Sequence, residues 1–176
     1  IFKNRILFNE PERGDVIVFK TPADNRTDYI KRLIGLPGDK IQFINSELYI
    51  NNNLIFKNKT SNNDKIYCGK KIVDVFSFKE KLPNGYDYKT VYFKNGSFQN
   101  SDIFIVPKDN YFFLGDNRDC SKDSRYLSSV GYVHKDNLVG KAKFIFFSSD
   151  RSFGSIFYFW KWNQSIRFDR FFKKII

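Results

Sequence analysis

The stretch at residues 28–40 reads DYIKRLIGLPGDK and joins an apolar segment to a strong turn signal. Its first part, 29–34, has the length and the β-branched and aromatic residues of a β-strand. Glycine and proline at 35–39 predict the turn that ends this strand. Further apolar stretches of strand length lie at 16–19, 41–44, 48–50, 72–78, 90–93, 103–106, 111–114 and 138–147. We therefore predict a mostly β chain.

The residues between 57 and 101 differ from their surroundings in composition. They are polar and rich in Asn and Lys, with turn sequences at Pro83-Asn84-Gly85 and Asn95-Gly96. We predict that they form a smaller β domain inserted into a β-barrel or sheet catalytic core. The core is then expected at 1–56 and 102–164, on either side of the insertion at 57–101, with a helical tail at 165–176.

The tail at 165–176 shows a helical pattern of aromatic and apolar residues. Those at i, i+3, i+4 and i+7 are Phe168, Phe171, Phe172 and Ile175. Basic residues lie largely off this stripe, so we predict a short basic amphipathic helix. Such a helix can lie on an anionic membrane or pack its aromatic face on the sheet, and both alternatives stay open.

The chain is strongly basic. Its 176 residues include 30 Lys and Arg against 19 Asp and Glu, for a formal net charge of +11. A basic protein of this size suggests nucleic acid or an anionic membrane surface as partner. The basic residues are scattered and no nucleic-acid-binding motif is visible, so we expect no nucleic-acid partner. No apolar run reaches the ~20 residues that span a bilayer.

Cysteine and histidine are too few for several kinds of site. Cys68 and Cys120 lie far apart without C-x-x-C spacing, and His134 is the single histidine. We therefore expect neither a disulfide framework nor a zinc ribbon. A His-based triad and a multi-histidine metal site are also unexpected, and the sequence predicts no metal and no cofactor.

Lys31 is unusual because it lies inside an apolar strand. Side chains alternate along a strand, so Lys31 and Arg32 point to opposite faces, and in a two-sided packing one of them approaches an apolar face. Burial disfavours the charged form of a lysine and lowers its pKa. A neutral amine can act as a general base and activate a serine hydroxyl without a histidine. The alternative is that Lys31 extends to solvent at an edge strand.

A polar loop at 115–125, with the sequence GDNRDCSKDSR, follows the apolar stretch at 111–114. Asp123 and Arg125 are close enough in sequence to pair and stiffen this loop. The hydroxyl of Ser121 could hold a neutral lysine in position. The alternatives are ordinary turn chemistry or a weak calcium-binding loop, which the arginines disfavour.

Together, the segments at 13–19, 28–40 and 115–125 closely resemble the conserved boxes of bacterial type I signal peptidase, the membrane-bound Ser–Lys endopeptidase of the S26 class. The resemblance runs from about Arg13 to Phe146. It implies an all-β catalytic core with an inserted β domain, active at the outer, periplasmic face of the bacterial inner membrane. It also implies two partners: preprotein signal peptides, cut after a small-x-small motif, and the anionic membrane surface.

The resemblance assigns roles to five residues of this chain. Lys31 matches the general base, and Ser121 matches the serine that orients its amine. Asp123 and Arg125 match the supporting salt bridge. Ile30 matches a position that lines the apolar pocket for small substrate side chains.

One family feature is absent from this sequence. The family's nucleophilic serine lies in a Ser-Met-x-Pro-like box upstream of Arg13, whereas the first serine here is Ser46. The second oxyanion-hole donor and the N-terminal membrane anchor would come from the same segment. We therefore expect a fragment of a longer protein that holds the base, lacks the nucleophile and is inactive as given. Cys120 also replaces a residue that is commonly Asn in the family.

Two alternative functions remain at this point. Self-cleaving SOS repressors also use a Ser–Lys dyad in the same fold, although the loop sequence and the large insertion favour the peptidase. The other alternative is a non-catalytic basic β module that binds an anionic membrane or nucleic acid.

Overall fold

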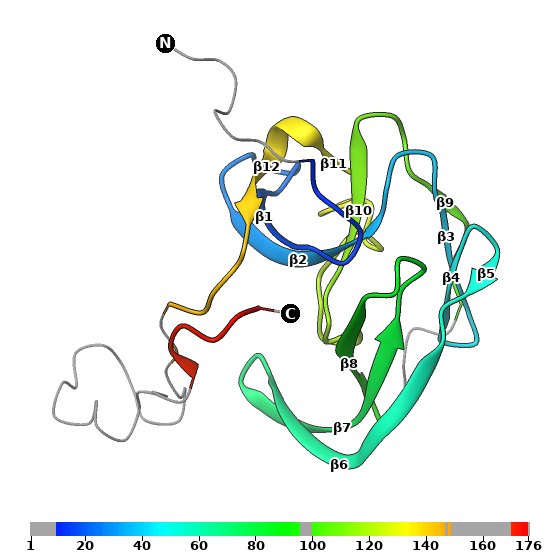
Figure 1. Ribbon diagram of the computed structural model, residues 1–176, viewed down its shortest axis with the longest axis vertical. Coiled ribbons are helices and arrows are strands. Elements are labelled where there is room, and N and C mark those ends of the chain that lie inside the picture. Colours follow the sequence, from blue (N-terminus) through cyan, green and yellow to red (C-terminus); the bar gives the residue numbers. More distant parts are fainter. Residues whose placement is uncertain (1–9, 96–99, 147, 149–169, 176) are drawn as a thin grey trace, which may run out of the picture. The chain divides into compact units, whose positions relative to one another are not determined.

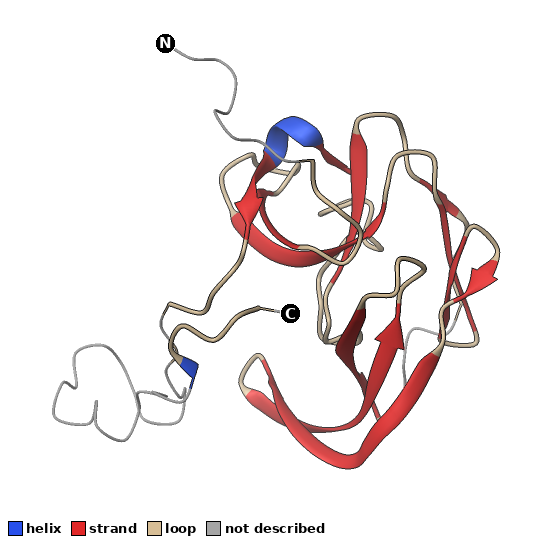
Figure 2. Cartoon of the chain, viewed as in Figure 1, coloured by secondary structure: helices blue, strands red, loops and turns tan. Residues whose placement is uncertain are grey.

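The computed structural model describes residues 10–95, 100–146, 148 and 170–175. The described residues are mostly β-strand with very little helix (Figures 1 and 2), which confirms the predicted fold class. The chain divides into two compact units, Ile1–Lys141 and Ala142–Ile176. Within the described residues, no helix has the length and apolar character needed to cross a membrane.

The first unit contains a five-stranded antiparallel sheet in the order β11-β10-β2-β1-β12. Its strands are β1 (Val16–Lys20), β2 (Asp28–Gly35), β10 (Asn110–Leu114), β11 (Val133–His134) and β12 (Leu138–Lys141), and the 3-10 helix η1 (Lys135–Asn137) joins the last two. The central strand β2 pairs with β1 on one side and with β10 on the other. The strand predicted from 29–34 is therefore the middle of the sheet.

A four-stranded sheet in the order β5-β4-β3-β9 follows in the same unit. Its strands are β3 (Lys40–Ile44), β4 (Glu47–Ile50), β5 (Asn53–Leu54) and β9 (Phe104–Ile105). Strands β3 and β4 form a hairpin, and Asn45 and Ser46 make its turn with φ angles of 50° and 65°. Two positive φ values give a turn whose twist matches that of the flanking strands.

A three-stranded sheet in the order β6-β7-β8 is built from β6 (Lys57–Cys68), β7 (Lys71–Lys81) and β8 (Asp87–Phe93). Figure 1 shows β6 and β7 as a long curved hairpin. Strand β6 was not predicted, because its sequence KNKTSNNDKIYC lacks an alternation of apolar residues. Its antiparallel pairing with β7 holds these residues in the extended conformation instead. The boundaries of a separate inserted domain at 57–101 stay a prediction.

Alternate residues of β2 enter two different hydrophobic cores. Leu33 packs with residues of β1, whereas Ile34 packs with residues of β3 and β4. Strand β10 follows the same rule, with Phe113 in the first core and Phe112 in the second. Both faces of the sheet are buried at its centre, which explains why these strands read as continuous apolar runs.

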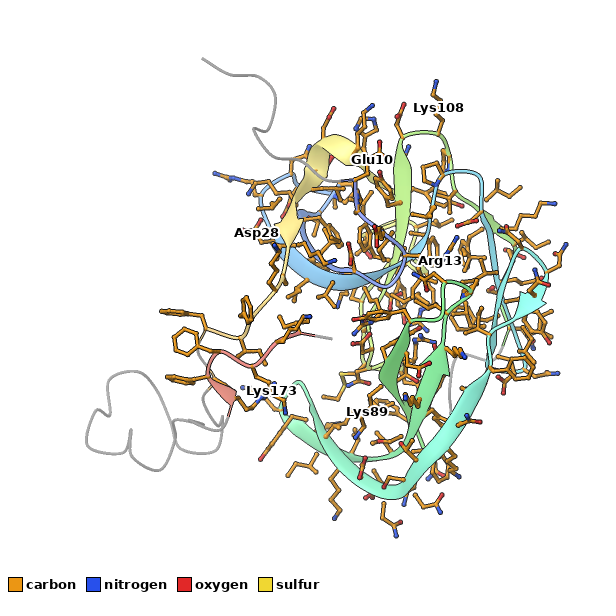
Figure 3. The ribbon with its side chains drawn as sticks, viewed as in Figure 1. Glu10, Arg13, Asp28, Lys89, Lys108 and Lys173 are labelled. Carbon is orange, nitrogen blue, oxygen red and sulfur yellow. A yellow bond between two sulfur atoms is a disulfide. The ribbon has the colours of Figure 1, made fainter. Side chains whose placement is uncertain are left out.

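The turn after β2 is tied to the start of the sheet. Arg13, which Figure 3 labels, pairs with Asp39 at 2.8 Å and also donates to the carbonyl oxygen of Ile34. The main-chain N–H of Leu36 donates to the same carboxylate at 2.6 Å. Burial would raise the pKa of Asp39, but these hydrogen bonds lower it overall. The residues at both ends of this turn thus hold each other in place.

The strand predicted at 138–147 was too long. Strand β12 ends at Lys141, and the residues after it belong to the second unit. There Phe144 forms an isolated antiparallel bridge with Lys174. The aromatic residues of this stretch therefore pair with the tail rather than extend the sheet.

The helix predicted for the tail is wrong over residues 170–175, which form a turn followed by an extended segment. Phe172 has a φ of 55°, a left-handed conformation that a right-handed helix cannot contain. Its main-chain N–H donates to the carbonyl oxygen of Ile145 at 2.8 Å, so the backbone pairs across segments instead of within a helix. Residues 165–169 of the prediction lie outside the described residues.

Cys68 and Cys120 form a disulfide, which corrects the expectation drawn from their spacing that no disulfide framework is available. Their Cα atoms are 5.7 Å apart, within the usual range, although 52 positions separate them in the sequence. The β6–β7 hairpin brings Cys68 to the loop that follows β10. Sequence spacing alone could not reveal a contact that the tertiary fold creates.

Gly35→Ala is expected to lower the free energy of unfolding by about 1–3 kcal/mol, because it overpacks a core. A Cβ at this position would lie 2.8 Å from the Cβ of Phe112 and 2.9 Å from Cγ2 of Val106. Both neighbours are buried, so the surrounding core must shift to make room. Urea denaturation measures the change.

Gly140→Ala is the matched control, since Gly140 also lies in a strand of the five-stranded sheet. A Cβ there would meet no described atom within 4 Å. We expect its unfolding free energy to change by less than about 0.5 kcal/mol. Equal losses for the two variants would contradict the packing argument.

Candidate active site

Lys31 lies on the face of β2 that also carries Tyr29 and Leu33, at the edge of a hydrophobic core. Burial lowers the pKa of its amine, while the charge of Asp123 raises it and the charge of Arg125 lowers it further. The amine nitrogen is 5.5 Å from the centre of the Tyr29 ring. With the described residues it forms no hydrogen bond and no ion pair, so the half-buried amine has no directly bonded partner there.

Arg32 points to the opposite face of β2 and is 3% exposed. Its guanidinium donates two hydrogen bonds of 2.8 Å to the carboxylate of Asp116 and one of 2.8 Å to the carbonyl oxygen of Gly14. It also lies 4.4 Å from the centre of the Tyr88 ring. Both residues of the Lys–Arg pair therefore face packed protein, but only the arginine has a carboxylate partner among the described residues.

The loop at 115–125 begins beside Lys31. Strand β10 ends at Leu114, which pairs with Arg32, so the antiparallel register places Gly115 opposite Lys31. A Cβ on Gly115 would overlap with the side chain of Ser121. Glycine is therefore required at this position, and it lets Ser121 approach the backbone next to the lysine.

Ser121 is 8% exposed, and its hydroxyl oxygen is buried. Among the described residues this oxygen has no hydrogen-bond partner, so it does not bond directly to the amine of Lys31. A buried unpaired hydroxyl costs about 1–3 kcal/mol. Such groups in a native structure often mark a place where another molecule or a catalytic group binds.

Asp123 and Arg125 form a buried ion pair on the other side of Ser121. The Nε of Arg125 donates to Oδ1 of Asp123 at 2.8 Å, and its terminal nitrogen donates to Oδ2 at 2.9 Å. The main-chain N–H of Gly115 donates to the same carboxylate at 3.0 Å. The ion pair thus joins the two ends of the loop around Ser121.

Ile30 precedes Lys31 in β2 and is 52% exposed. Because side chains alternate, it projects from the opposite face of the strand. The fold therefore brings Lys31 together with the loop residues Ser121, Asp123 and Arg125, and leaves Ile30 on the adjoining surface.

Sequence analysis missed the ion pair that holds the first half of the loop. Arg118 is 1% exposed and donates hydrogen bonds of 2.8 and 2.6 Å to the two carboxylate oxygens of Glu80 in β7. The hydroxyls of Tyr88 and Tyr92 donate to the same carboxylate. Burial would raise the pKa of Glu80, but the charge of Arg118 and the tyrosine hydroxyls lower it overall. The partners are 38 positions apart, so no local pattern could pair them.

Main-chain hydrogen bonds dock the same half of the loop on β8 (Figure 1). The N–H of Val91 donates to the carbonyl oxygen of Asp116, and the N–H of Arg118 donates to that of Val91, each at 2.9 Å. The N–H of Phe93 donates to the carboxylate of Asp119 at 2.6 Å. The three-stranded sheet therefore supports the loop that carries Ser121.

Comparisons with known proteins show what this chain is similar to. Residues 1–147 match the family described as signal peptidase, peptidase S26. The chain is 43% identical to signal peptidase I of Rickettsia typhi and 42% identical to that of Rickettsia prowazekii, over 99% of its own length and 70% of each relative. The crystal structure of a signal peptidase I from Enterococcus faecalis aligns at 27% identity with a TM-score of 0.49, over 77% of this chain and 99% of that one.

Glu80→Gln is expected to lower the free energy of unfolding by about 3–5 kcal/mol. The substitution keeps the shape of the side chain but leaves the charge of Arg118 buried without a counter-charge. Chemical denaturation at neutral pH measures the loss.

Glu47→Gln is the matched control, because Glu47 pairs with Lys57 at a site where its own side chain is 37% exposed. Glu47 is partly in solvent, and Lys57 keeps its 2.8 Å hydrogen bond to the carbonyl oxygen of Ser46, so this variant should lose only about 0–1 kcal/mol. A similar small loss at Glu80 would mean that the Arg118 pair does not hold the loop.

Proposed function

This chain belongs to the signal peptidase family of the peptidase S26 class, and on that basis we propose that Lys31 is the general base of its peptidase site. The family is one of hydrolases, and the relatives named above are signal peptidases I. The observation that carries the proposal is the environment of Lys31, a half-buried amine with a lowered pKa and no ion-pair partner among the described residues. A lower pKa raises the fraction of neutral amine at neutral pH, which a general base requires.

Ser121 is the residue that orients this amine in our proposal. Its hydroxyl is buried without a partner among the described residues, and it packs on Gly115 opposite Lys31. A hydroxyl oxygen can accept a hydrogen bond from a neutral amine and so direct the nitrogen lone pair elsewhere. The Asp123–Arg125 ion pair supports this arrangement by holding the loop closed.

The proposed substrate is a preprotein signal peptide, cut after a small-x-small motif. Ile30 would contact small substrate side chains, and its 52% exposure beside the lysine supports that role. The proposed location is the periplasmic face of the bacterial inner membrane. A formal net charge of +11 suits a protein that works beside anionic lipid headgroups.

The nucleophile of the proposed reaction is not among residues 1–30, which contain no serine. Ser46, the first serine of the chain, lies in the β3–β4 turn of the four-stranded sheet, whereas Lys31 lies in the five-stranded sheet. We therefore propose that this chain supplies the base and its support, while the attacking hydroxyl comes from sequence outside the 176 residues.

Lys31→Ala should reduce cleavage at least about a thousandfold in the protein made from its complete reading frame, because the attacking hydroxyl then has no base. The measurement is the rate of cleavage of a synthetic preprotein with an Ala-x-Ala site. Lys122→Ala is the matched control, since Lys122 is an exposed lysine of the same loop, and it should cleave at a near-normal rate.

The 176-residue chain alone, tested in the same assay, should show no cleavage. Cleavage by this chain would contradict the proposal on the nucleophile. A near-normal rate for Lys31→Ala would contradict the assignment of the base.

The pH dependence of cleavage should follow the titration of Lys31. A base works only when neutral, so kcat/KM should rise with pH through the pKa of Lys31 and fall away below it. Because that pKa is lowered from the ordinary 10.5, the midpoint of the rise should lie below pH 10.5. A profile that is flat with pH, or one whose midpoint lies at the ordinary lysine value, would argue against a desolvated base.

A further inference from the structure

A disulfide ends at the residue that precedes Ser121. It joins Cys120 to Cys68, the last residue of β6, at the tip of the β6–β7 hairpin. Both cysteines are half-buried, so a small reagent can reach the bond. None of the roles proposed above makes use of this cross-link.

We propose that Cys68 and Cys120 are positioning residues for the peptidase site, because their disulfide holds Ser121 against Gly115 and thereby keeps water from the Lys31 amine. The inference rests on the function proposed for Lys31 and Ser121 and adds a covalent constraint to that site.

Ser121 needs such a constraint because few hydrogen bonds hold it and the residue before it in place. Its hydroxyl has no hydrogen-bond partner among the described residues, and the main-chain N–H of Cys120 makes a long bond of 3.3 Å to the side chain of Asn117. Shorter hydrogen bonds are found at Asp119 on one side and at Asp123 on the other. The disulfide is therefore the firm anchor nearest in sequence to Ser121.

The anchors on either side do not involve the cysteines. The ion pairs of Arg118 and Asp123, and the main-chain bonds to β8, involve neither cysteine, so we expect them to persist when the sulfur–sulfur bond is broken. Breaking it should therefore release residues 120–122 without unfolding the rest of the loop. Water can then reach the Lys31 amine, and the ammonium form is favoured again.

A purely structural disulfide would behave differently. A cross-link over 52 positions stabilises a protein mainly by restricting the unfolded chain. In that case the folded protein would keep the same Lys31 environment with or without the bond. The titration of Lys31 in the folded state therefore separates the two roles.

The test measures the pKa of Lys31 in the 176-residue chain by NMR of ¹³C-methylated lysines, with the signal assigned through Lys31→Arg. Dithiothreitol supplies two electrons and two protons, so the disulfide becomes two thiols and the reagent becomes a cyclic disulfide. We expect reduction to raise the pKa of Lys31 by about half a unit or more. Amide hydrogen exchange at 120–122 should become about tenfold faster.

Two controls accompany this measurement. Lys108 is exposed and points away from the sheets in Figure 3, so its methyl signal serves as the control and should be the same in the two redox forms. The variant Cys68→Ser/Cys120→Ser should show the reduced values with and without dithiothreitol. If that variant does not fold, the comparison of oxidised and reduced parent protein still distinguishes a positioning disulfide from a purely structural one.

Identical Lys31 titration and amide exchange in the two redox forms would overturn the proposal. So would global unfolding on reduction, seen as lost protection in β2 and β10, because the disulfide would then act on the whole fold. These measurements need no cleavage, whereas the test of Lys31 as base measures cleavage alone. Either proposal can therefore fail without the other.

Discussion

The buried ion pair between Arg118 and Glu80 sets the position of the loop that carries Ser121. A guanidinium removed from water costs several kcal/mol unless its charge and its N–H groups are compensated. Here the charge is compensated by both carboxylate oxygens of Glu80, and the two terminal nitrogens also donate to the hydroxyls of Tyr88 and Tyr92, all in the three-stranded sheet. The buried Nε has no hydrogen-bond partner among the described residues. Any other position of the loop would leave two charges buried apart, so this one is strongly preferred. The main-chain bonds to β8 hold the loop in the same position.

Strand β2 explains why the same loop also reaches the lysine. Both faces of the strand are covered, so the consecutive residues Lys31 and Arg32 must enter two different packed environments. The loop neutralises Arg32 through Asp116. It offers no hydrogen-bonding carboxylate to Lys31 within the described residues, because Asp123 is engaged with Arg125. One loop therefore gives the arginine on one face of β2 a carboxylate partner and leaves the lysine on the other face without one.

The central strands could be predicted from the sequence because their apolar residues are contiguous and are bounded by glycine and proline. Strand β6 could not, since its polar residues are ordered by pairing with β7 rather than by burial. The partners of Arg118 and of Cys120 are distant in sequence, so only the tertiary fold reveals them. The expected location could nevertheless have indicated a disulfide, because a protein at the periplasmic face lies in an oxidising compartment, where paired cysteines form disulfides.

The Asp123–Arg125 ion pair has an electrostatic consequence as well as a mechanical one. Burial lowers the pKa of Lys31, the charge of Asp123 raises it, and the charge of Arg125 lowers it. Because the two loop charges are paired within 2.8 Å, they act on the amine as a dipole whose effects oppose each other, and burial decides the outcome. Asp123 alone would stabilise the ammonium form and leave the proposed base protonated. The buried carboxylate of Asp123 accepts a hydrogen bond from the N–H of Gly115. Because Arg125 offsets the charge of this carboxylate, the nearby lysine is not held in its ammonium form.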